Sequence, residues 1–256
     1  MPMQSVRNVY RSEYNGSEVV VYEVDEVVQS MSFTEEEKRN DLVLEYTQCM
    51  CDAAEEKKEC RDMLVIGSAG YSIPKYMISR HPDLRMDVVD LDETAEETAR
   101  EYFYLDDLYK TYGTERLSTI TAEGREYMET CGKQYDIIML DAFIGELPAF
   151  TLFTKEGLGC AKKCLKKGGW IIANLPGMIE TEDFPLTYDF AHTFVQEFSY
   201  VSLLMQKSYQ SEDECNYILI ASDAPVFFDG QMYLDMQWGN TLEDADIPVL
   251  LEEYED

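Results

Sequence analysis

The feature that most constrains the fold is a regular alternation of short apolar segments with helical segments, which begins at residue 63. The first strand-like segment opens MLVIGSAGYS, and the others are RMDVVDLD, LSTITAEG, YDIIMLDAF and WIIANLPG. Nearly uninterrupted apolar strands separated by helices are typical of a parallel sheet that is covered on both faces. We therefore predict an α/β fold built on a doubly wound, mostly parallel sheet.

The residues before this alternation predict a small separate unit. Residues 17–33 combine β-branched and aromatic residues around a turn-like pair, Asp25 and Glu26, which is typical of a β-hairpin. We assign residues 1–33 to this N-terminal β-hairpin appendage. The chain then enters the main domain.

The main domain is expected to span residues 34–225. A capping-box pattern at Thr34 predicts one amphipathic helix over residues 34–59. A second helix is expected over residues 93–104, and the segment KEGLGCAKKCLKKGG predicts a helix that ends at glycine. Three further elements would complete the sheet with an antiparallel hairpin: a helix near 183–198 and strands near 200–206 and 216–222.

The charge of the chain excludes one class of partner. Its 51 Asp and Glu outnumber 21 Lys and Arg, which gives a formal net charge of −30. Nucleic-acid binding draws much of its affinity from Lys and Arg, so we expect no nucleic-acid partner, and anionic membranes are disfavoured for the same reason. Eight acids lie between Asp235 and Asp256 without a Lys or Arg, so residues 226–256 are expected to form a solvated or partly disordered acidic tail.

Other residue types narrow the chemistry further. Seven cysteines lack a paired CxxC spacing, which indicates reduced, structural thiols and no metal site. The two histidines, His81 and His192, leave little for a histidine-based mechanism. The N-terminus has no apolar leader and no later run approaches the roughly 20 apolar residues of a membrane span, so a cytoplasmic location is expected.

Small residues after the first strand are the first candidate site. In open α/β sheets, ligands bind at the carboxyl ends of the strands, near the point where the strand order reverses. Gly67, Ser68, Ala69 and Gly70 would let the backbone approach a ligand beside a helix N-terminus. Such a turn alone is equally consistent with a plain connection between strand and helix.

Carboxylates end the following strands. Asp90 stands at the spacing of a ribose-hydroxyl acceptor, although it would also serve as a helix cap, the role that better suits Asp92. Glu123 can accept from an exocyclic amine such as that of adenine, and Asp141 would face the reacting end of the nucleoside. This set fits a nucleoside without phosphates, because carboxylates repel pyrophosphate and attract a sulfonium cation such as that of S-adenosylmethionine.

In this combination the sequence resembles the spermidine synthase (polyamine aminopropyltransferase) superfamily, a branch of the Rossmann-like S-adenosylmethionine-dependent methyltransferase fold. The resemblance covers roughly residues 12–222 and includes MLVIGSAGYSIPKYM, DVVDLDETAEETAREYF, TAEGREYM, YDIIMLDAF and LKKGGWIIANLPG. It implies that Asp90 with the adjacent Leu91 holds the ribose, that Glu123 with Gly124 holds the adenine, that Gln29 closes over the nucleoside, and that Asp141 is the catalytic candidate. It also implies a homodimer.

The sequence departs from the family at two acidic positions. The family aspartate that binds the propylamine end of decarboxylated S-adenosylmethionine corresponds to Gly70, and the aspartate that deprotonates the attacking amine corresponds to Ile144. Isoleucine neither accepts a proton nor binds an ammonium group. The family tyrosine and histidine on the helix after the hairpin are not evident either, although Tyr46 lies nearby.

Three functions follow from these observations. The leading hypothesis is methyl transfer from S-adenosylmethionine to a small-molecule acceptor, an amine among the candidates, with Asp141 orienting the acceptor and Tyr71, Glu146 and Tyr46 as weaker candidates. The alternative is an aminopropyltransferase that makes a polyamine from decarboxylated S-adenosylmethionine and putrescine, with a relocated carboxylate such as Glu146. The second alternative is a non-catalytic nucleoside-binding or scaffold protein of the same fold.

Overall fold

A seven-stranded sheet forms the centre of the molecule. The computed structural model describes residues 7–144, 147–177, 185–205, 215–228 and 239–254. The strand order is β11-β12-β10-β7-β4-β5-β6, and β12 runs antiparallel to both of its neighbours while the others pair in parallel. The strands are β4 (Asp62–Ile66), β5 (Arg85–Asp90), β6 (Leu117–Thr121), β7 (Tyr135–Leu140), β10 (Leu165–Gly177), β11 (Tyr200–Met205) and β12 (Cys215–Ser222). The predicted doubly wound, mostly parallel sheet is confirmed.

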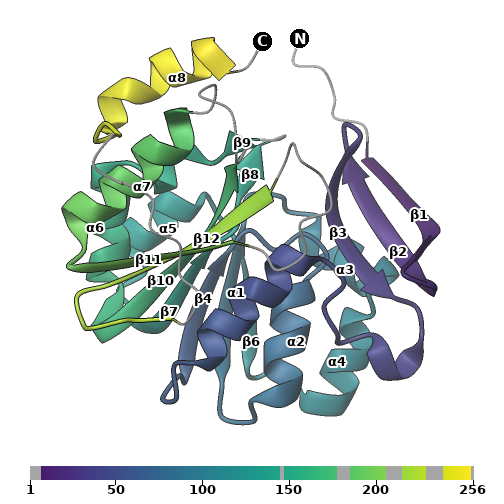
Figure 1. Cartoon of the computed structure of the whole chain (residues 1–256). Helices are drawn as coiled ribbons and strands as arrows, with labels where there is room; N and C mark the ends of the chain where they lie inside the picture. The colour runs from purple at the N-terminus through teal and green to yellow at the C-terminus, as the bar shows by residue number, and fades with distance from the viewer. Residues whose placement is uncertain (1–6, 145–146, 178–184, 206–214, 229–238, 255–256) are drawn as a thin grey trace.

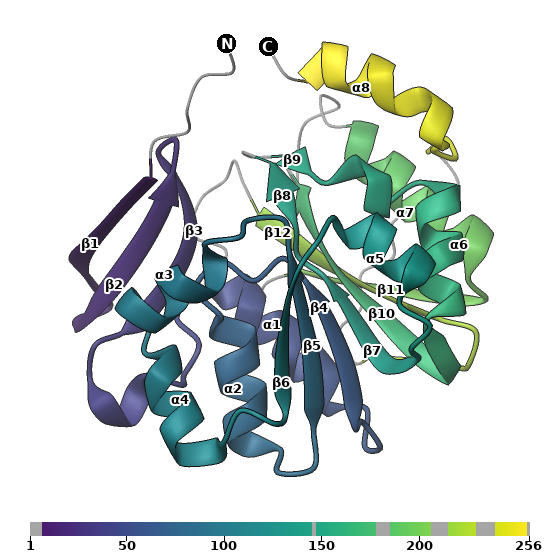
Figure 2. The same cartoon turned by 180° about the vertical axis from the view of Figure 1, so that it is seen from behind.

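Helices cover both faces of this sheet (Figures 1 and 2). One face carries α1 (Glu45–Glu55), α2 (Ser72–Arg80), α3 (Ala95–Tyr102) and α4 (Leu105–Tyr112), and the other carries α5 (Gly124–Thr130), α6 (Lys155–Lys163) and α7 (Pro185–Glu197). Short elements occur at η1 (Glu36–Lys38), β8 (Phe143–Ile144), β9 (Leu147–Pro148) and η2 (Phe150–Leu152). No helix among the described residues is long and apolar enough to cross a membrane.

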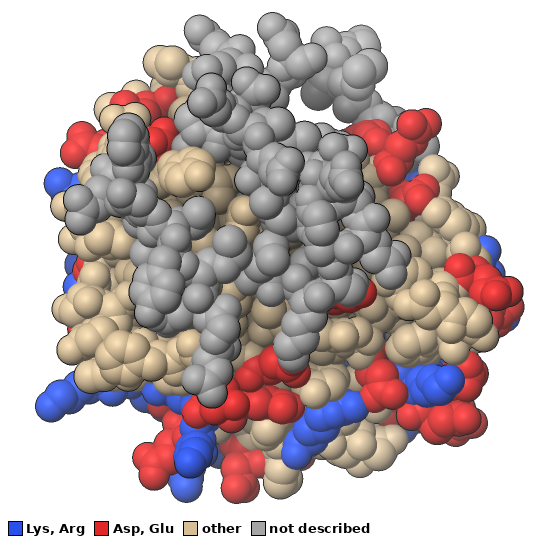
Figure 3. Space-filling view, viewed as in Figure 1, with Lys and Arg blue, Asp and Glu red and all other residues tan. Residues whose placement is uncertain are grey.

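Acidic side chains on the surface are partly matched by basic ones. In Figure 3, Asp and Glu gather along the lower edge of the molecule, with Lys and Arg among them. Arg100 contacts Asp106 at 2.8 Å, and Lys110 contacts Asp107 at 3.2 Å. Such exposed pairs contribute at most about 1 kcal/mol each, so the fold depends on its core.

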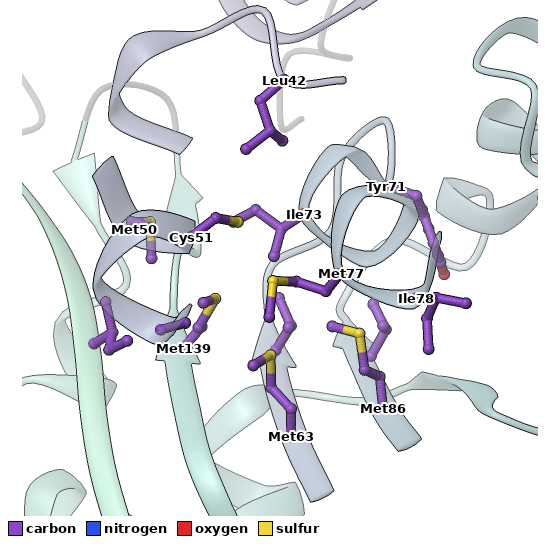
Figure 4. Close-up of a cluster of buried hydrophobic side chains, with 14 of the residues drawn as sticks. Leu42, Met50, Cys51, Met63, Tyr71, Ile73, Met77, Ile78, Met86 and Met139 are labelled. Atoms are coloured by element: carbon purple, nitrogen blue, oxygen red, sulfur yellow. The ribbon is translucent and has the colours of Figure 1, made fainter. Parts of the chain in front are cut away.

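The core has one layer on each face of the sheet. Met63 and Val65 of β4 pack toward α1 and α2, whereas Leu64 and Ile66 pack toward α5 and α6, and all four are buried. Figure 4 shows the first layer, in which methionines from β4, β5 and β7 meet residues of α1 and α2. Alternate residues of each strand thus enter different layers, which is why the strands are apolar throughout.

The N-terminal unit is a three-stranded antiparallel sheet of β1 (Arg7–Tyr14), β2 (Ser17–Val24) and β3 (Val27–Phe33). The predicted hairpin is β2 and β3, with Asp25 and Glu26 at positive φ in its turn. The predicted hairpin is confirmed, and β1, which was not predicted, adds a third strand to it. The side chains of β1 are mostly exposed and polar, so the strand lacks the apolar alternation that marks a half-buried strand.

Three predicted helix boundaries were wrong. The helix expected over 34–59 is only α1 after the short η1, because the Thr34 hydroxyl donates to the Glu18 carbonyl at 3.3 Å and caps no helix. The helix expected over 93–104 ends at Tyr102, and Tyr104, at φ 62°, separates it from α4. α6 ends at Lys163, before the glycines that were expected to end it, and Gly168 lies within β10.

The acidic C-terminal region contains ordered elements, η3 (Asp244–Asp246) and α8 (Ile247–Tyr254). Leu242 and Leu250 are buried in the same core layer as α6 and α7. Thr154 donates to Asp244 at 2.6 Å, and the Asp244 amide donates to Glu156 at 3.0 Å. Residues 242–250 are therefore ordered rather than disordered, because Leu242 and Leu250 attach this segment to the domain, although most of its other side chains are exposed, as the solvated alternative predicts.

Candidate active site

The candidate site lies where the strand order reverses. From β4 the chain proceeds outward through β5 and β6, and it then returns to β7 on the other side of β4. The carboxyl ends of β4 and β7 are joined by a hydrogen bond of 2.9 Å from the Asp141 amide to the Ile66 carbonyl. A cavity of about 720 Å³ opens at this edge. Its volume is within the range of small-molecule sites.

The cavity brings the predicted donor-site residues together, with one exception. Its lining includes Gln29, Gly67, Ser68, Ala69, Asp90, Leu91, Glu123, Gly124 and Asp141. Gly70 is absent from it. The binding roles of these residues stay predictions, but the convergence that those roles require is present.

The two glycines in the turn after β4, Gly67 and Gly70, face different neighbours. Gly67 has φ +90°, and a Cβ atom there would meet the carbonyl group of Asp141, whose carbon would lie at 2.6 Å. Only glycine lets these two backbones pass so closely. Gly70 instead faces away from the cavity, where a Cβ atom would meet Ser30 Oγ at 2.5 Å and the Phe103 ring at 2.9 Å. The predicted contact of Gly70 with the donor stays a prediction.

Asp90 is held in place at the end of β5 by neighbouring groups. One carboxylate oxygen accepts from the Ser68 amide at 2.9 Å and from the Ser68 hydroxyl at 2.6 Å, and the other accepts from the Asp92 amide at 2.9 Å. Asp92 accepts from the Thr94 amide at 2.9 Å, but Thr94 is the N-cap residue of α3 and this helix has no side-chain cap, so the predicted N-cap role of Asp92 is wrong. Asp90 thus links the glycine turn to its own loop, and its carboxylate keeps acceptor capacity toward the cavity.

Glu123 is the N-cap residue of α5. Its carboxylate accepts from the Glu126 amide at 2.8 Å and from the Thr151 hydroxyl at 3.1 Å. These contacts explain a glutamate at this position without a ligand. They also fix the carboxylate at the cavity wall, so contact with an exocyclic amine remains a prediction.

Asp141 has the most unusual environment in the cavity. Asn174 donates to its carboxylate at 2.9 Å, and the Tyr46 hydroxyl hydrogen-bonds to it from α1. Burial raises the pKa of Asp141 to about 7, although both hydrogen bonds act in the opposite direction. Burial and the neighbouring Asp141 raise the pKa of Tyr46 well above its ordinary value. A carboxyl group that titrates near neutral pH is suited to accept a proton.

The other weak candidates behave differently. Tyr71 is fully buried, its hydroxyl donates to Thr119 at 3.3 Å, and it does not line the cavity, so a role at the reaction centre is wrong. Glu146 lies outside the described residues. Asn174 was not identified from the sequence, because an asparagine inside a buried strand carries no motif.

Elements far from the main site motifs complete the cavity wall. Arg7, Tyr22 and Val24 come from the N-terminal sheet, and Ile247 and Leu251 come from α8. Arg7 is the one Lys or Arg among the described lining residues, and it contacts Asp92 at 2.8 Å. The lining acids Asp90, Asp92, Glu123 and Asp141 therefore give the cavity a negative potential that favours a cationic ligand.

Comparison with known proteins identifies the family. The model of the spermine/spermidine synthase domain matches residues 45–205. The chain belongs to this family. Two curated relatives illustrate the similarity. This chain is 33% identical over 115 residues to a polyamine aminopropyltransferase of Vibrio vulnificus, and 29% identical over 115 residues to polyamine aminopropyltransferase 2 of Hyperthermus butylicus. Each match covers 44% of this chain, and the chain spans only 36% and 37% of these relatives.

Solved structures show the same fold for this spermine/spermidine synthase domain protein. A probable spermidine synthase from Corynebacterium glutamicum superposes with a TM-score of 0.75 at 17% identity, covering 94% of each chain. Spermidine synthase from Thermotoga maritima gives a TM-score of 0.58 at 19% identity, covering 85% of this chain and 73% of that one. Human methyltransferase-like protein 13 in complex with SAH gives 0.58 at 19% identity, covering 76% and 87%. The expected Rossmann-like methyltransferase fold is confirmed.

Proposed function

We propose that this protein transfers an aminopropyl group from decarboxylated S-adenosylmethionine to a small amine. The observation that carries the proposal is Asp141, a carboxyl group with a pKa of about 7 inside an acidic cavity of the family fold. The curated relatives are named polyamine aminopropyltransferases, and they favour this reaction over the methyl transfer that the sequence alone led us to expect.

The residues of the cavity fit the donor. We assign the ribose hydroxyls to Asp90, the adenine to the wall formed by Leu91, Glu123 and Gly124, and the sulfonium end to Gly67 and Asp141. The donor supplies an alkyl carbon. The bond from this carbon to the positively charged sulfur breaks as a bond to the acceptor nitrogen forms, and the rest of the donor leaves as neutral methylthioadenosine. The acids of the lining attract the sulfonium charge, and the apolar wall favours the adenine ring.

Asp141 would act on the acceptor. A primary amine is mostly protonated at neutral pH and must lose a proton to expose its lone pair. The Asp141 carboxylate attracts the ammonium group and accepts its proton, while Asn174 and Tyr46 hold the carboxylate in place. General-base catalysis of this kind contributes about 10²–10⁴ in rate. This assignment also removes the need for a carboxylate at Ile144.

Methyl transfer is the second candidate, and one observation favours it. The family position that would hold the propylamine end of the donor is Gly70, which has no side chain to hold an ammonium group. Without a carboxylate there, ordinary S-adenosylmethionine meets less repulsion of its own carboxylate. The two reactions differ in the donor and in the group that moves.

A turnover assay with both donors separates these functions. The purified chain is incubated with decarboxylated S-adenosylmethionine or S-adenosylmethionine and with a panel of amines that includes putrescine, and the products are identified by mass spectrometry. We expect methylthioadenosine and an aminopropylated amine. S-adenosylhomocysteine with a methylated product would establish methyl transfer instead, and failure of calorimetry to detect binding of either donor or of methylthioadenosine would contradict both enzyme functions.

Asp141→Asn tests the assigned base. The variant keeps the size and the hydrogen-bonding shape of the side chain but removes its basicity, so we expect turnover to fall about 10²-fold or more while methylthioadenosine still binds. Asp83→Asn is the matched control, because Asp83 is an exposed acid that does not line the cavity. Equal turnover of the two variants would show that Asp141 is not the base.

A further inference from the structure

Two side-chain hydrogen bonds connect Asp141, which follows β7, to β10 and β12, the next two strands of the sheet. Asn216 of β12 donates through its amide nitrogen to the Asn174 oxygen at 2.7 Å, and Asn174 of β10 donates through its amide nitrogen to Asp141 at 2.9 Å. Asn174 is only 2% exposed. Neither asparagine lines the cavity, so neither contacts a ligand there.

The chemistry of the three groups fixes the direction of these two hydrogen bonds. An ionised carboxylate only accepts hydrogen bonds, so Asn174 must turn its NH₂ group toward Asp141. Its oxygen then faces Asn216, which satisfies it with its own NH₂ group. Asn216 therefore prevents the Asn174 amide from rotating by half a turn, which would bring one oxygen against another at Asp141.

We infer that Asn174, held in orientation by Asn216, is a positioning residue that keeps the Asp141 side chain aimed at the acceptor and favours its ionised form. The inference rests on the proposed function in one respect, since it takes Asp141 to be the base. A buried carboxylate without this donor would be protonated over a wider pH range, and its side chain would lose one of its two anchors.

Other ionisable groups near Asp141 are the same in the variant and in the unmodified protein. Among the described residues, the titratable side chain that hydrogen-bonds to Asp141 is Tyr46 of α1, which is uncharged at neutral pH because its pKa is raised. Arg7, Asp90, Asp92 and Glu123 line the same cavity, and the substitution of Asn174 removes none of them. The turn after β4 contributes Gly67 and its backbone, and β10 contributes Asn174. Removal of the Asn174 donor is therefore expected to shift the titration of Asp141 directly.

The test uses Asn174→Leu and Asn216→Leu in the full chain, with Ser222→Ala as a matched control. Ser222 is a buried polar residue of β12 whose hydroxyl donates to the Gly169 carbonyl at 2.9 Å, away from Asp141. The Asp141 carboxyl carbon is followed by ¹³C NMR in protein labelled at the Asp side chains, and its signal is the one that disappears in Asp141→Asn. The pH profile of kcat/KM is measured in parallel with the donor that turns over.

For Asn174→Leu we expect the pKa of Asp141 to rise from about 7 by about one pH unit or more, which leaves at least about fivefold less carboxylate at pH 7. The pH profile should shift by the same amount, and kcat should fall while KM for the donor changes little. Asn216→Leu should shift the pKa of Asp141 and the pH profile in the same direction, by a smaller amount. Activity that is lost equally at every pH, with an unmoved carboxyl titration, would overturn the inference.

The two readouts also separate this inference from the proposed function. If no donor turns over, the NMR titration still decides whether Asn174 controls Asp141. If turnover is robust but the Asp141 signal titrates identically in the unmodified protein and in Asn216→Leu, the reaction stands and the inference is wrong. Asn216 lies nearer the surface than Asn174, so its variant provides this decision even where Asn174→Leu fails to fold.

Discussion

Gly67→Ala tests whether the glycine turn and the candidate base form one rigid unit. At this position a methyl group meets two separate obstacles. The backbone has φ +90°, and the added Cβ atom would lie 2.6 Å from the Asp141 carbonyl carbon and 2.8 Å from the Ala142 nitrogen. All of these contacts are with backbone, so no side-chain rotation relieves them.

A matched variant separates the two contributions to the loss of stability, the backbone conformation and the steric contact. Gly132 has φ +61° and open space where its Cβ atom would lie, so Gly132→Ala carries the conformational cost alone, about 1–2 kcal/mol. Gly67→Ala adds the displacement of the Asp141 backbone, and overpacking of this kind costs about 1–3 kcal/mol more. We expect its free energy of unfolding to fall by about 2–5 kcal/mol in total.

Function should respond more strongly than stability. The contact pushes Asp141 away from the turn by several tenths of an ångström, and a misplacement near 1 Å costs about 10²-fold in rate. Urea denaturation, calorimetry with methylthioadenosine and turnover are compared for both variants. The reasoning is refuted if Gly67→Ala matches Gly132→Ala in all three measurements, because the close approach of the two strand ends would then have no consequence.

Four further predictions concern Asp141, Lys75 and α8. Turnover should rise with pH through about 7, because the carboxylate of Asp141 is the basic form; a pH profile that is flat between pH 6 and 8, or that falls as pH rises, would contradict this. The raised pKa also means that Asp141 favours folding below its unfolded value and that this contribution is lost as pH rises through about 7, so Asp141→Asn should stabilise the fold at pH 8 by roughly 1–3 kcal/mol in urea denaturation. Burial lowers the pKa of Lys75 to about 7, so the unfolding free energy should increase between pH 7 and 10, at most by about 1.4 kcal/mol per pH unit, and Lys75→Met should remove this increase. Ile247→Ala with Leu251→Ala should weaken methylthioadenosine binding about five- to tenfold by calorimetry, whereas Val249→Ala, at a position of α8 that is 64% exposed, should not.

The fold was predictable because its determinants are local in the sequence. Apolar strands with a glycine turn and helices between them require cover on both faces, and β4 shows this directly, with Met63 and Leu64 in different core layers. The errors occurred where tertiary contacts decide the structure. β1 is almost fully exposed and is a strand because it pairs with β2, and residues 242–250 are acidic yet packed through Leu242 and Leu250.

The donor side of the site was predictable for the same reason, and the base environment was not. Gly67, Asp90, Glu123 and Asp141 each follow a strand, and parallel strands bring their carboxyl ends to one edge. The groups that act on Asp141 come instead from α1, β10 and β12, and their side chains meet only through the strand order. The homodimer implied by the family resemblance stays a prediction.

The net charge of −30 indicates less about the reaction than the partners of single carboxylates do. Asp92 contacts Arg7, Asp90 accepts from Ser68 and a backbone amide, and Glu123 caps a helix. Each of these acids is held by a neighbouring group and serves to hold the cavity in shape. Among the described residues, Asn174 and Tyr46 are the donors to Asp141, and these neutral groups do not offset its burial, so the pKa of Asp141 is raised. Loss of a surface acid should therefore leave the reaction unchanged, whereas loss of one neutral partner of Asp141 should alter its pH dependence.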